Sequence, residues 1–249
     1  MKLAIIGYGR MGHMIEEIAK QRGHRIVCVI DVDNPDAFNT DDYKSADVAI
    51  EFTTPGTAVE NILKSFASKV PVVCGTTGWL DALPELKDLC DKGEGTLLYA
   101  SNFSIGVNVF MAVNRYLAKL MNDFPEYTPS MTEIHHIHKL DHPSGTAITL
   151  AEDMVAAVTR LDCWEEPEEG KELDKNALPI EHQRQGEVPG THIINWDSPV
   201  DTITITHCAK SREGFALGAV KAAEWLKGKK GYHTISDMLS DVTHTQGIF

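Results

Sequence analysis

The stretch of the chain richest in chemically useful side chains is EIHHIHKLDHPSGT, residues 133–146. It holds four histidines with a lysine among them, followed by a Pro-Ser-Gly-Thr run. An imidazole can deliver or accept a proton near neutral pH, and a lysine offers a point charge to an anion. The amides of Ser144, Gly145 and Thr146, at the start of a helix, would favour a carboxylate. The segment therefore indicates proton transfer to a small acidic substrate with a reducible double bond.

Two other interpretations of the histidines stay open. Zinc needs three or four ligands within ~2.3 Å of one point. On a strand, however, His136 and His138 would face one side and His135 the other, and no H-E-x-x-H pattern occurs. We therefore expect no metal here. The second interpretation is that the histidines are ordinary solvated surface residues, which would explain one imidazole better than four.

A second motif, GYGRMG, places Gly7, Gly9 and Gly12 in G-x-G-x-x-G spacing. It directly follows an apolar run and opens an amphipathic pattern, the context in which glycines let backbone amides approach a pyrophosphate. Asp31 ends the second apolar run, 19 residues after Gly12, which suits an acid that holds an adenosine ribose. The motif predicts an NAD-type dinucleotide; a glycine turn that has lost its ligand is the alternative.

The residues around Asp31 favour NADH. A 2′-phosphate beside this carboxylate would be repelled, and the next residue is Val32 rather than a base. Arg10 is the nearby cation of the glycine turn that would let NADPH be tolerated. CGTTGW (74–79) and YASNFSIGVN (99–108) each follow a predicted strand, where contacts to the nicotinamide and its ribose are expected; ordinary turn chemistry is the alternative.

The elements that position these motifs follow from hydrophobic periodicity. The first hundred residues alternate short apolar runs with amphipathic stretches, which predicts a Rossmann-type doubly wound parallel sheet. Strands are expected at 2–7, 25–30, 47–52, 71–75 and 96–100, and helices at 10–22, from 55, and at 82–91.

The pattern changes after residue 104. A longer helix is expected over 106–124, with Val109, Val113, Tyr116, Leu117 and Leu120 on one stripe. A strand over 130–139, a helix over 144–159 with Ser144 as N-cap, an antiparallel hairpin over 191–210 and a helix over 215–228 follow. The acidic stretch 161–190 is expected to be a solvated connection. We therefore predict a dinucleotide-binding domain, 1–104 completed by 213–249, and an inserted α+β substrate-binding and tetramerisation domain, 105–212.

Composition limits the class of protein. The 249 residues carry a formal net charge of −13, which argues against nucleic acid as a partner. No apolar run approaches the ~20 residues of a membrane span, and the five cysteines are scattered without a C-x-x-C pair. We expect a cytoplasmic protein without a disulfide framework.

EIHHIHKLDHPSGTA resembles the dihydrodipicolinate reductase family, whose pattern is approximately E-x-H-H-x-x-K-x-D-x-P-S-G-T-A. GYGRMG, EFTTP, CGTTGW, ASNFSIGVN, RQGEVPGTH and SREGFALGA are similar to further family segments in the same order. The resemblance implies NAD(P)H-dependent reduction of 4-hydroxy-tetrahydrodipicolinate, a cyclic dicarboxylate, in lysine and diaminopimelate biosynthesis. It also implies a homotetramer.

The same resemblance assigns roles to individual residues. His135 is implied as the acid/base and Lys139 as a proton donor that also contacts substrate. Further substrate contacts are expected from His136, Ser144, Gly145 and Thr146. The implied cofactor contacts are Gly7, Tyr8, Gly9, Arg10, Met11, Gly12, Asp31, Gly75, Thr76, Thr77, Ala100, Ser101, Asn102 and Phe103.

Two departures from the family pattern concern the cofactor and the acidic stretch. The segment after the second strand is shorter than in many members and lacks the basic residue often found there, which bears on NADPH affinity. Residues 161–181 also differ, and no role is assigned to them. The rival hypotheses are another Rossmann oxidoreductase acting on an amino- or dicarboxylic acid, a nucleotide-sensing protein without turnover, and a metallohydrolase.

Overall fold

The computed structural model describes residues 1–244 of the chain. These form two compact units, which are described separately. Within the described residues, the first contains 1–105 and 213–244, and the second contains 106–212. The predicted completion of the first domain to residue 249 includes 245–249, which lie outside the described residues.

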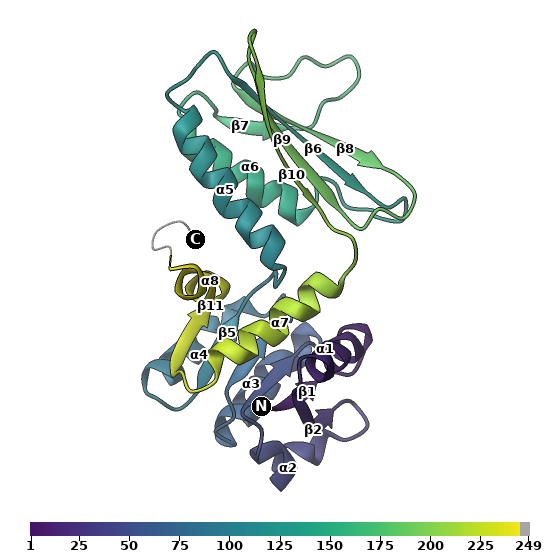
Figure 1. The fold of residues 1–249 in the computed structure, drawn as a ribbon, viewed down its shortest axis with the longest axis vertical. Helices are drawn as coiled ribbons and strands as arrows, with labels where there is room; N and C mark the ends of the chain where they lie inside the picture. Colours follow the sequence, from purple (N-terminus) through teal and green to yellow (C-terminus); the bar gives the residue numbers. More distant parts are fainter. Residues whose placement is uncertain (245–249) are drawn as a thin grey trace. The chain divides into compact units, whose positions relative to one another are not determined.

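The first unit is built on a six-stranded sheet in the order β11-β5-β4-β3-β1-β2 (Figure 1). All its pairings are parallel. From β1, the sheet is extended on one side by β2 and on the other side by β3, β4 and β5. The position between β1 and β3 is therefore the switch point at which doubly wound sheets bind ligands. The strands are β1 (Lys2–Ile6), β2 (Arg25–Ile30), β3 (Val48–Glu51), β4 (Val72–Cys74), β5 (Thr96–Tyr99) and β11 (Gly231–Thr234).

Helices cover both faces of this sheet, because alternate strand residues point to opposite sides. Leu3 and Ile5 pack with α1 (Arg10–Gln21), α7 (Glu213–Leu226) and α8 (Ile235–Thr243). Ala4 and Ile6 pack with Phe38 of the short helix η1 (Pro35–Asn39) and Tyr43 of α2 (Asp41–Lys44). The core beneath β4 and β5 contains α3 (Pro55–Ala67) and α4 (Leu83–Asp91), which the turn η2 (Leu80–Ala82) precedes. The predicted Rossmann-type fold class is confirmed.

The second unit has a mixed sheet in the order β10-β9-β6-β8-β7. Helices α5 (Ile105–Met121) and α6 (Gly145–Ala157) pack on one face of it, over a core that includes Met131, Ile194 and Trp196 (Figure 1). The strands are β6 (Thr128–His135), β7 (Cys163–Glu165), β8 (Ala177–Arg184), β9 (Thr191–Asp197) and β10 (Thr202–Cys208). β9 and β10 form the predicted antiparallel hairpin, whereas β6 and β8 run parallel.

Two sequence expectations about the second unit are wrong. Residues 161–190 are not a solvated connection throughout, because β8 lies between β6 and β7 and buries Leu178 and Ile180. The strand predicted over 130–139 ends at His135, so His136 and His138 lie in a loop. The apolar stripe predicted for α5 is present, and most of it is on the exposed side. The exposed members are Val109, Val113, Tyr116 and Leu120, and the buried face has Val107, Phe110, Ala118 and Met121.

Sequence patterning also missed the strand β11 and the helix α8 of the first unit, together with the short helices η1, α2 and η2. Tyr232 and His233 do not form an apolar run, and every residue of β11 is only partly buried, so this strand has no hydrophobic pattern in the sequence.

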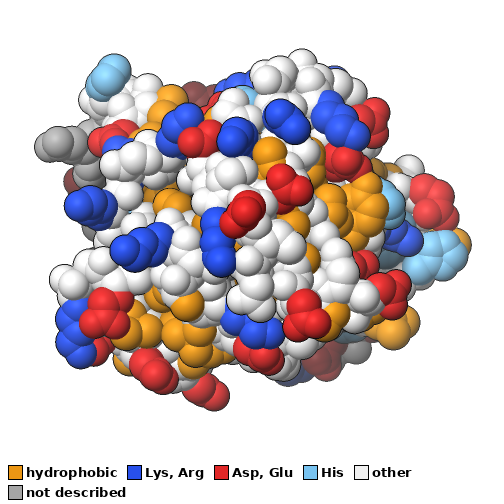
Figure 2. Space-filling model, turned by 90° about the horizontal axis from the view of Figure 1, so that it is seen from below, with side chains coloured by type: hydrophobic (Ala, Val, Ile, Leu, Met, Phe, Trp, Pro, Cys, Tyr) orange, Lys and Arg blue, Asp and Glu red, His pale blue; other side chains and the backbone are white. Residues whose placement is uncertain are grey.

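On the face shown in Figure 2, acidic and basic side chains are interspersed. Within residues 1–244, no helix has both the length and the apolar character of a membrane span.

Candidate active site

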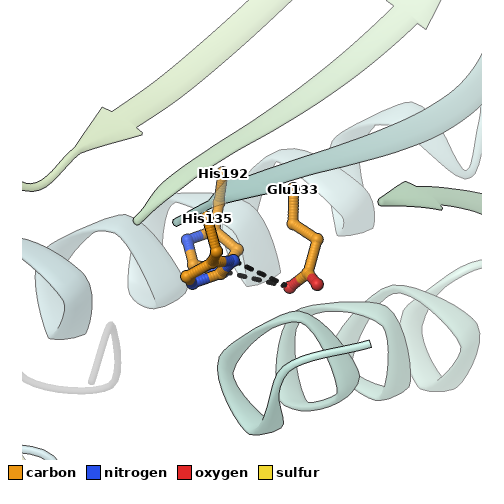
Figure 3. Close-up of side chains that lie close together, drawn as sticks. All are labelled: Glu133, His135 and His192. Atoms are coloured by element: carbon orange, nitrogen blue, oxygen red, sulfur yellow. Dashed lines mark ion pairs between the residues drawn. The ribbon is translucent and has the colours of Figure 1, made fainter. Parts of the chain in front are cut away.

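Strand alternation and register bring three polar side chains together in the second unit. Pro129, Met131, Glu133 and His135 are the buried residues of β6, so Glu133 and His135 continue the face that Met131 turns toward the core. His192 on β9 lies directly opposite Glu133 in the antiparallel pairing. Figure 3 shows the Glu133 carboxylate beside both imidazoles, with Oε2 3.6 Å from His135 Nδ1 and 3.8 Å from His192 Nε2.

Burial determines the charge state of this cluster. It lowers the pKa of His192 to about 4 and also moves the pKa of His135 below its usual value, although Glu133 opposes the second shift. Burial alone would raise the pKa of Glu133, but hydrogen bonding from Ser144 and the two facing imidazoles brings that pKa below its usual value. Near neutral pH the cluster is therefore one buried carboxylate between two neutral imidazoles.

The loop after β6 is held by Arg184 of β8. Its guanidinium donates to the carbonyl oxygens of Lys139 (3.1 Å) and Asp141 (2.8 Å), and its Nη1 lies 3.5 Å from Glu133 Oε1. The same arginine thus links the buried carboxylate to the loop that carries Lys139. The Lys139 ammonium, 19% exposed, pairs with Asp141 at 2.6 Å.

The start of α6 completes the cluster. Ser144 is the N-cap as predicted, and its hydroxyl accepts from the amide of Ala147 at 3.2 Å. The Ser144 amide donates to Glu133 Oε2 at 3.0 Å, and its hydroxyl lies 3.2 Å from His192 Nε2. Gly145 and Thr146 open the helix, where first-turn amides have no partner within the helix, and a Cβ on Gly145 would meet open space. This helix start can receive a carboxylate.

The three glycines of the GYGRMG turn in the first unit have different surroundings. Gly7 has φ +91°, and a Cβ there would lie 2.1 Å from the carbonyl oxygen of Phe52. A Cβ on Gly12 would lie 2.2 Å from the Gly7 carbonyl oxygen, so this glycine permits close packing of helix on strand. Gly9, the N-cap of α1, has no heavy atom within 4 Å of such a Cβ. The open helix start fits a pyrophosphate.

A cavity of about 410 Å³ lies at this turn. Its walls include Gly7, Tyr8, Gly9 and Asp31 of the predicted cofactor set. They also include residues after β3 and from α3 that the prediction had not named, namely Phe52, Thr53, Thr54, Thr57, Asn61 and Lys64. Lys64 pairs with Glu60 at 2.7 Å, so the cation in the wall that contains Asp31 is Lys64, and Arg10 is not among the lining residues.

The remaining predicted cofactor residues follow β4 and β5, at the same carboxyl edge of the sheet as Gly7. Thr76 is buried, and its hydroxyl accepts from the amide of Thr53 at 2.8 Å. Ala100 and Phe103 are buried as well, and Asn102 accepts from the amide of Ser104 at 2.8 Å. Part of this set therefore forms hydrogen bonds or is buried within this edge of the first unit.

The structure thus groups the predicted substrate residues in the second unit and the predicted cofactor residues in the first. Sequence reasoning missed Glu133, Arg184 and His192 as members of the histidine cluster. Glu133 lies two residues before His135, which on a strand means the same face, so alternation was a usable signal. Arg184 and His192 are the first and last residues of RQGEVPGTH, so the family resemblance pointed to this segment, but it did not give the register that brings them to Glu133.

Comparison with known proteins gives one consistent match. The family model described as dihydrodipicolinate reductase, N-terminus, matches residues 1–103, and the C-terminal model matches residues 106–239. A 4-hydroxy-tetrahydrodipicolinate reductase of Christiangramia forsetii is 48% identical over 242 residues, covering 97% of this chain and 99% of the relative. One from Archaeoglobus fulgidus is 34% identical over 262 residues, covering 96% and 100%.

A solved structure has the same fold. It is the dipicolinate-bound dihydrodipicolinate reductase of Paenisporosarcina sp. TG-14, with a TM-score of 0.74 and 20% identity, covering 94% of this chain and 97% of that one. A probable dehydrogenase of Thermotoga maritima is more distant, with a TM-score of 0.55 and 10% identity over 95% and 92% of the two chains.

Proposed function

The chain belongs to the dihydrodipicolinate reductase family, and we propose that it reduces 4-hydroxy-tetrahydrodipicolinate to tetrahydrodipicolinate in lysine and diaminopimelate biosynthesis. It is an NAD(P)H-dependent oxidoreductase, and the reduced nicotinamide supplies the hydride when bound. The observation that carries the proposal is the buried Glu133–His135–His192 cluster beside the start of α6. It combines a proton-transfer group with a carboxylate-binding helix start in one unit.

The side chains of the second unit divide the work as follows. The amides of Gly145 and Thr146, with His136, bind the substrate carboxylates. The 4-hydroxyl group of the substrate leaves as water, which creates the double bond that is reduced. His135 and Lys139 supply the proton at the ring atom next to the one that takes the hydride. Because burial holds the pKa of His135 below its usual value, the free enzyme has a neutral imidazole. The negative charge of a bound dicarboxylate would raise that pKa, so His135 would take up its proton from solvent when the substrate binds.

For the cofactor, we propose NADH as the preferred form with NADPH tolerated. Asp31 in the wall of the cavity supports this preference, because its carboxylate can accept from a ribose hydroxyl and repels a phosphate. Lys64 in the same wall supports tolerance of NADPH, since its ammonium can offset part of that repulsion.

We also propose a homotetramer. The support is the exposed apolar stripe of α5, where Val109, Val113, Tyr116 and Leu120 are 38%, 43%, 59% and 48% exposed. Contiguous apolar surface on one helix face is typical of a protein interface. The five free thiols fit a reducing compartment, which supports the cytoplasm as location. Light scattering at several protein concentrations tests the assembly; a monomer at every concentration would contradict it.

The deciding assay follows loss of NADH absorbance with the condensation product of pyruvate and aspartate semialdehyde as substrate. Turnover is expected with the complete mixture and not when either precursor is left out. A chain that instead reduces NAD with an amino acid is an amino-acid dehydrogenase, and the proposal is then wrong. Binding of cofactor without turnover of any such acid would identify a nucleotide-sensing protein.

A further inference from the structure

A second cluster of ligand-type side chains lies in the second unit, outside the proton-transfer cluster. His142 comes from the loop before α6, Glu166 directly follows β7, and His182 is on β8. His142 Nδ1 lies 2.9 Å from Glu166 Oε1, and His182 Nδ1 lies 2.8 Å from the same oxygen. The two imidazole rings are stacked, with centroids 4.0 Å apart and planes 15° from parallel.

We propose that His142, Glu166 and His182 bind one divalent transition-metal ion of the Zn²⁺, Co²⁺ or Ni²⁺ type. Their three ligand atoms all lie within 4.8 Å of one another. Two imidazole nitrogens with one carboxylate oxygen are a set that these ions accept, and further positions can be taken by water. The earlier expectation of no metal considered the histidines of one segment alone, whereas this set comes from three.

The geometry needs a small adjustment. Ligand atoms of a tetrahedral site with bonds of about 2.0–2.1 Å lie roughly 3.3 Å apart, so the contacts of 2.8 and 2.9 Å must widen and the rings must tilt. The side chains are free enough to do so, being 47%, 22% and 35% exposed for His142, Glu166 and His182. Exposure also gives an ion and its waters direct access.

Local charge favours a cation. Glu165 and Glu181 flank the cluster in sequence, Glu168 and Glu169 follow it, and the whole chain carries −13. Such an excess of carboxylates raises the local concentration of divalent cations. Without an ion, the Glu166 carboxylate is the shared partner of both imidazoles, with His142 Nδ1 also 3.2 Å from Oε2; a metal ion would bind all three groups at once.

Occupation of the site would fasten the loop over residues 136–144 to β7 and β8. This loop carries Lys139 and leads directly into Ser144, while His182 is the register partner of Glu133 on the neighbouring strand. The ion would therefore stabilise the conformation of the loop over residues 136–144, and it would not contact the reacting atoms.

The test is a Co²⁺ titration of the full-length protein, followed by visible absorption and by the thermal midpoint. The wild type should develop a weak visible band at one equivalent, and its midpoint should rise, because an ion that binds the folded state stabilises it. His142→Ala and His182→Ala should each weaken Co²⁺ binding by at least about tenfold, the lower end of what loss even of an outer partner costs. His138→Ala is the matched control. It removes a histidine of the same loop that pairs with Glu187 at 3.0 Å and has no second imidazole on that carboxylate, so binding should be unchanged.

Three outcomes would overturn the proposal. The first is absence of saturable binding in the wild type. The second is equal affinity in wild type, His142→Ala and His182→Ala. The third is loss of binding in His192→Gln with retention in His182→Ala, which would place the ion in the buried cluster. An intense near-ultraviolet band would indicate a cysteine thiolate as ligand, with Cys163 nearest in sequence to Glu166, and would likewise contradict the proposed ligands.

Discussion

Replacing His192 should flatten the dependence of folding stability on pH. This imidazole is 5% exposed, and burial lowers its pKa in the folded protein to about 4. In the unfolded chain the pKa returns to about 6.5. Acid therefore protonates the unfolded state first, and the contribution of His192 to stability is fully present above about pH 7 and is lost as the pH falls toward 4.

The size of the effect follows from the two pKa values. Between about pH 7.5 and about pH 5, a group that titrates at 6.5 unfolded and 4 folded lowers the free energy of unfolding by about 2 kcal/mol. His135 shifts in the same direction and adds to the loss. Protonation of Glu133 also lowers the free energy of unfolding, but only as the pH falls below its ordinary pKa of 4.5. Within this window the imidazoles therefore dominate the cluster.

Urea unfolding followed by tryptophan fluorescence, at several pH values across the window, measures the effect. His192→Gln keeps a polar group near Ser144 but has no proton to take up, so its decline in stability should be smaller than that of the wild type by about 2 kcal/mol. His138→Gln is the control, because that side chain is 67% exposed and should keep the wild-type dependence. An equal loss of stability in His192→Gln and in the wild type between the two pH values would contradict a depressed pKa at His192.

Three further predictions concern activity. His135→Gln should lower kcat by about 10²–10⁴-fold with little change in KM, because a positioned acid acts mainly in the transition state; near-wild-type turnover would refute its assignment. Gly190→Ala should lower kcat by about tenfold or more, since its Cβ would lie 3.0 Å from His135 Nε2 and small displacements of a reacting group are costly. Gly186→Ala, also at positive φ but with open space around its Cβ, separates that effect from backbone strain. Asp31→Asn should narrow the preference for NADH over NADPH in kcat/KM and in the Kd of each cofactor; a wild type that already prefers NADPH tenfold would contradict the proposed preference.

The first unit could be predicted from the sequence almost element by element, because its strands are continuous apolar runs. KLAII, VAIE and VVC are buried on both faces, so composition alone identifies them as central parallel strands. The glycine turn was also predicted from the sequence; the backbone around Gly7 and Gly12 leaves no room for a Cβ, and Gly9 opens helix α1. β11 was missed because an edge strand that is partly exposed throughout carries no such signal.

The second unit was harder to predict because its pattern is ambiguous where its function lies. ALPIEHQR of β8 begins with four apolar residues, of which every second one is buried, and ends in polar ones, inside an acidic stretch. The polar half is the part that reaches the cluster. The α5 stripe shows a different ambiguity. Its exposed apolar face has the same helical period as its buried face, and periodicity cannot tell a core from an interface between subunits.

A neutral imidazole suits a reductase of this kind better than one that is protonated in the free enzyme. A buried imidazolium beside Lys139 and Arg184 would repel both, and these are the cations that lower the pKa of His135 after burial itself. The carboxylate of Glu133 compensates for only one positive charge, and Ser144 and Arg184 already engage it. In the proposed reaction, the negative charge of a bound dicarboxylate would raise the pKa of His135, and proton uptake by this imidazole would then accompany substrate binding.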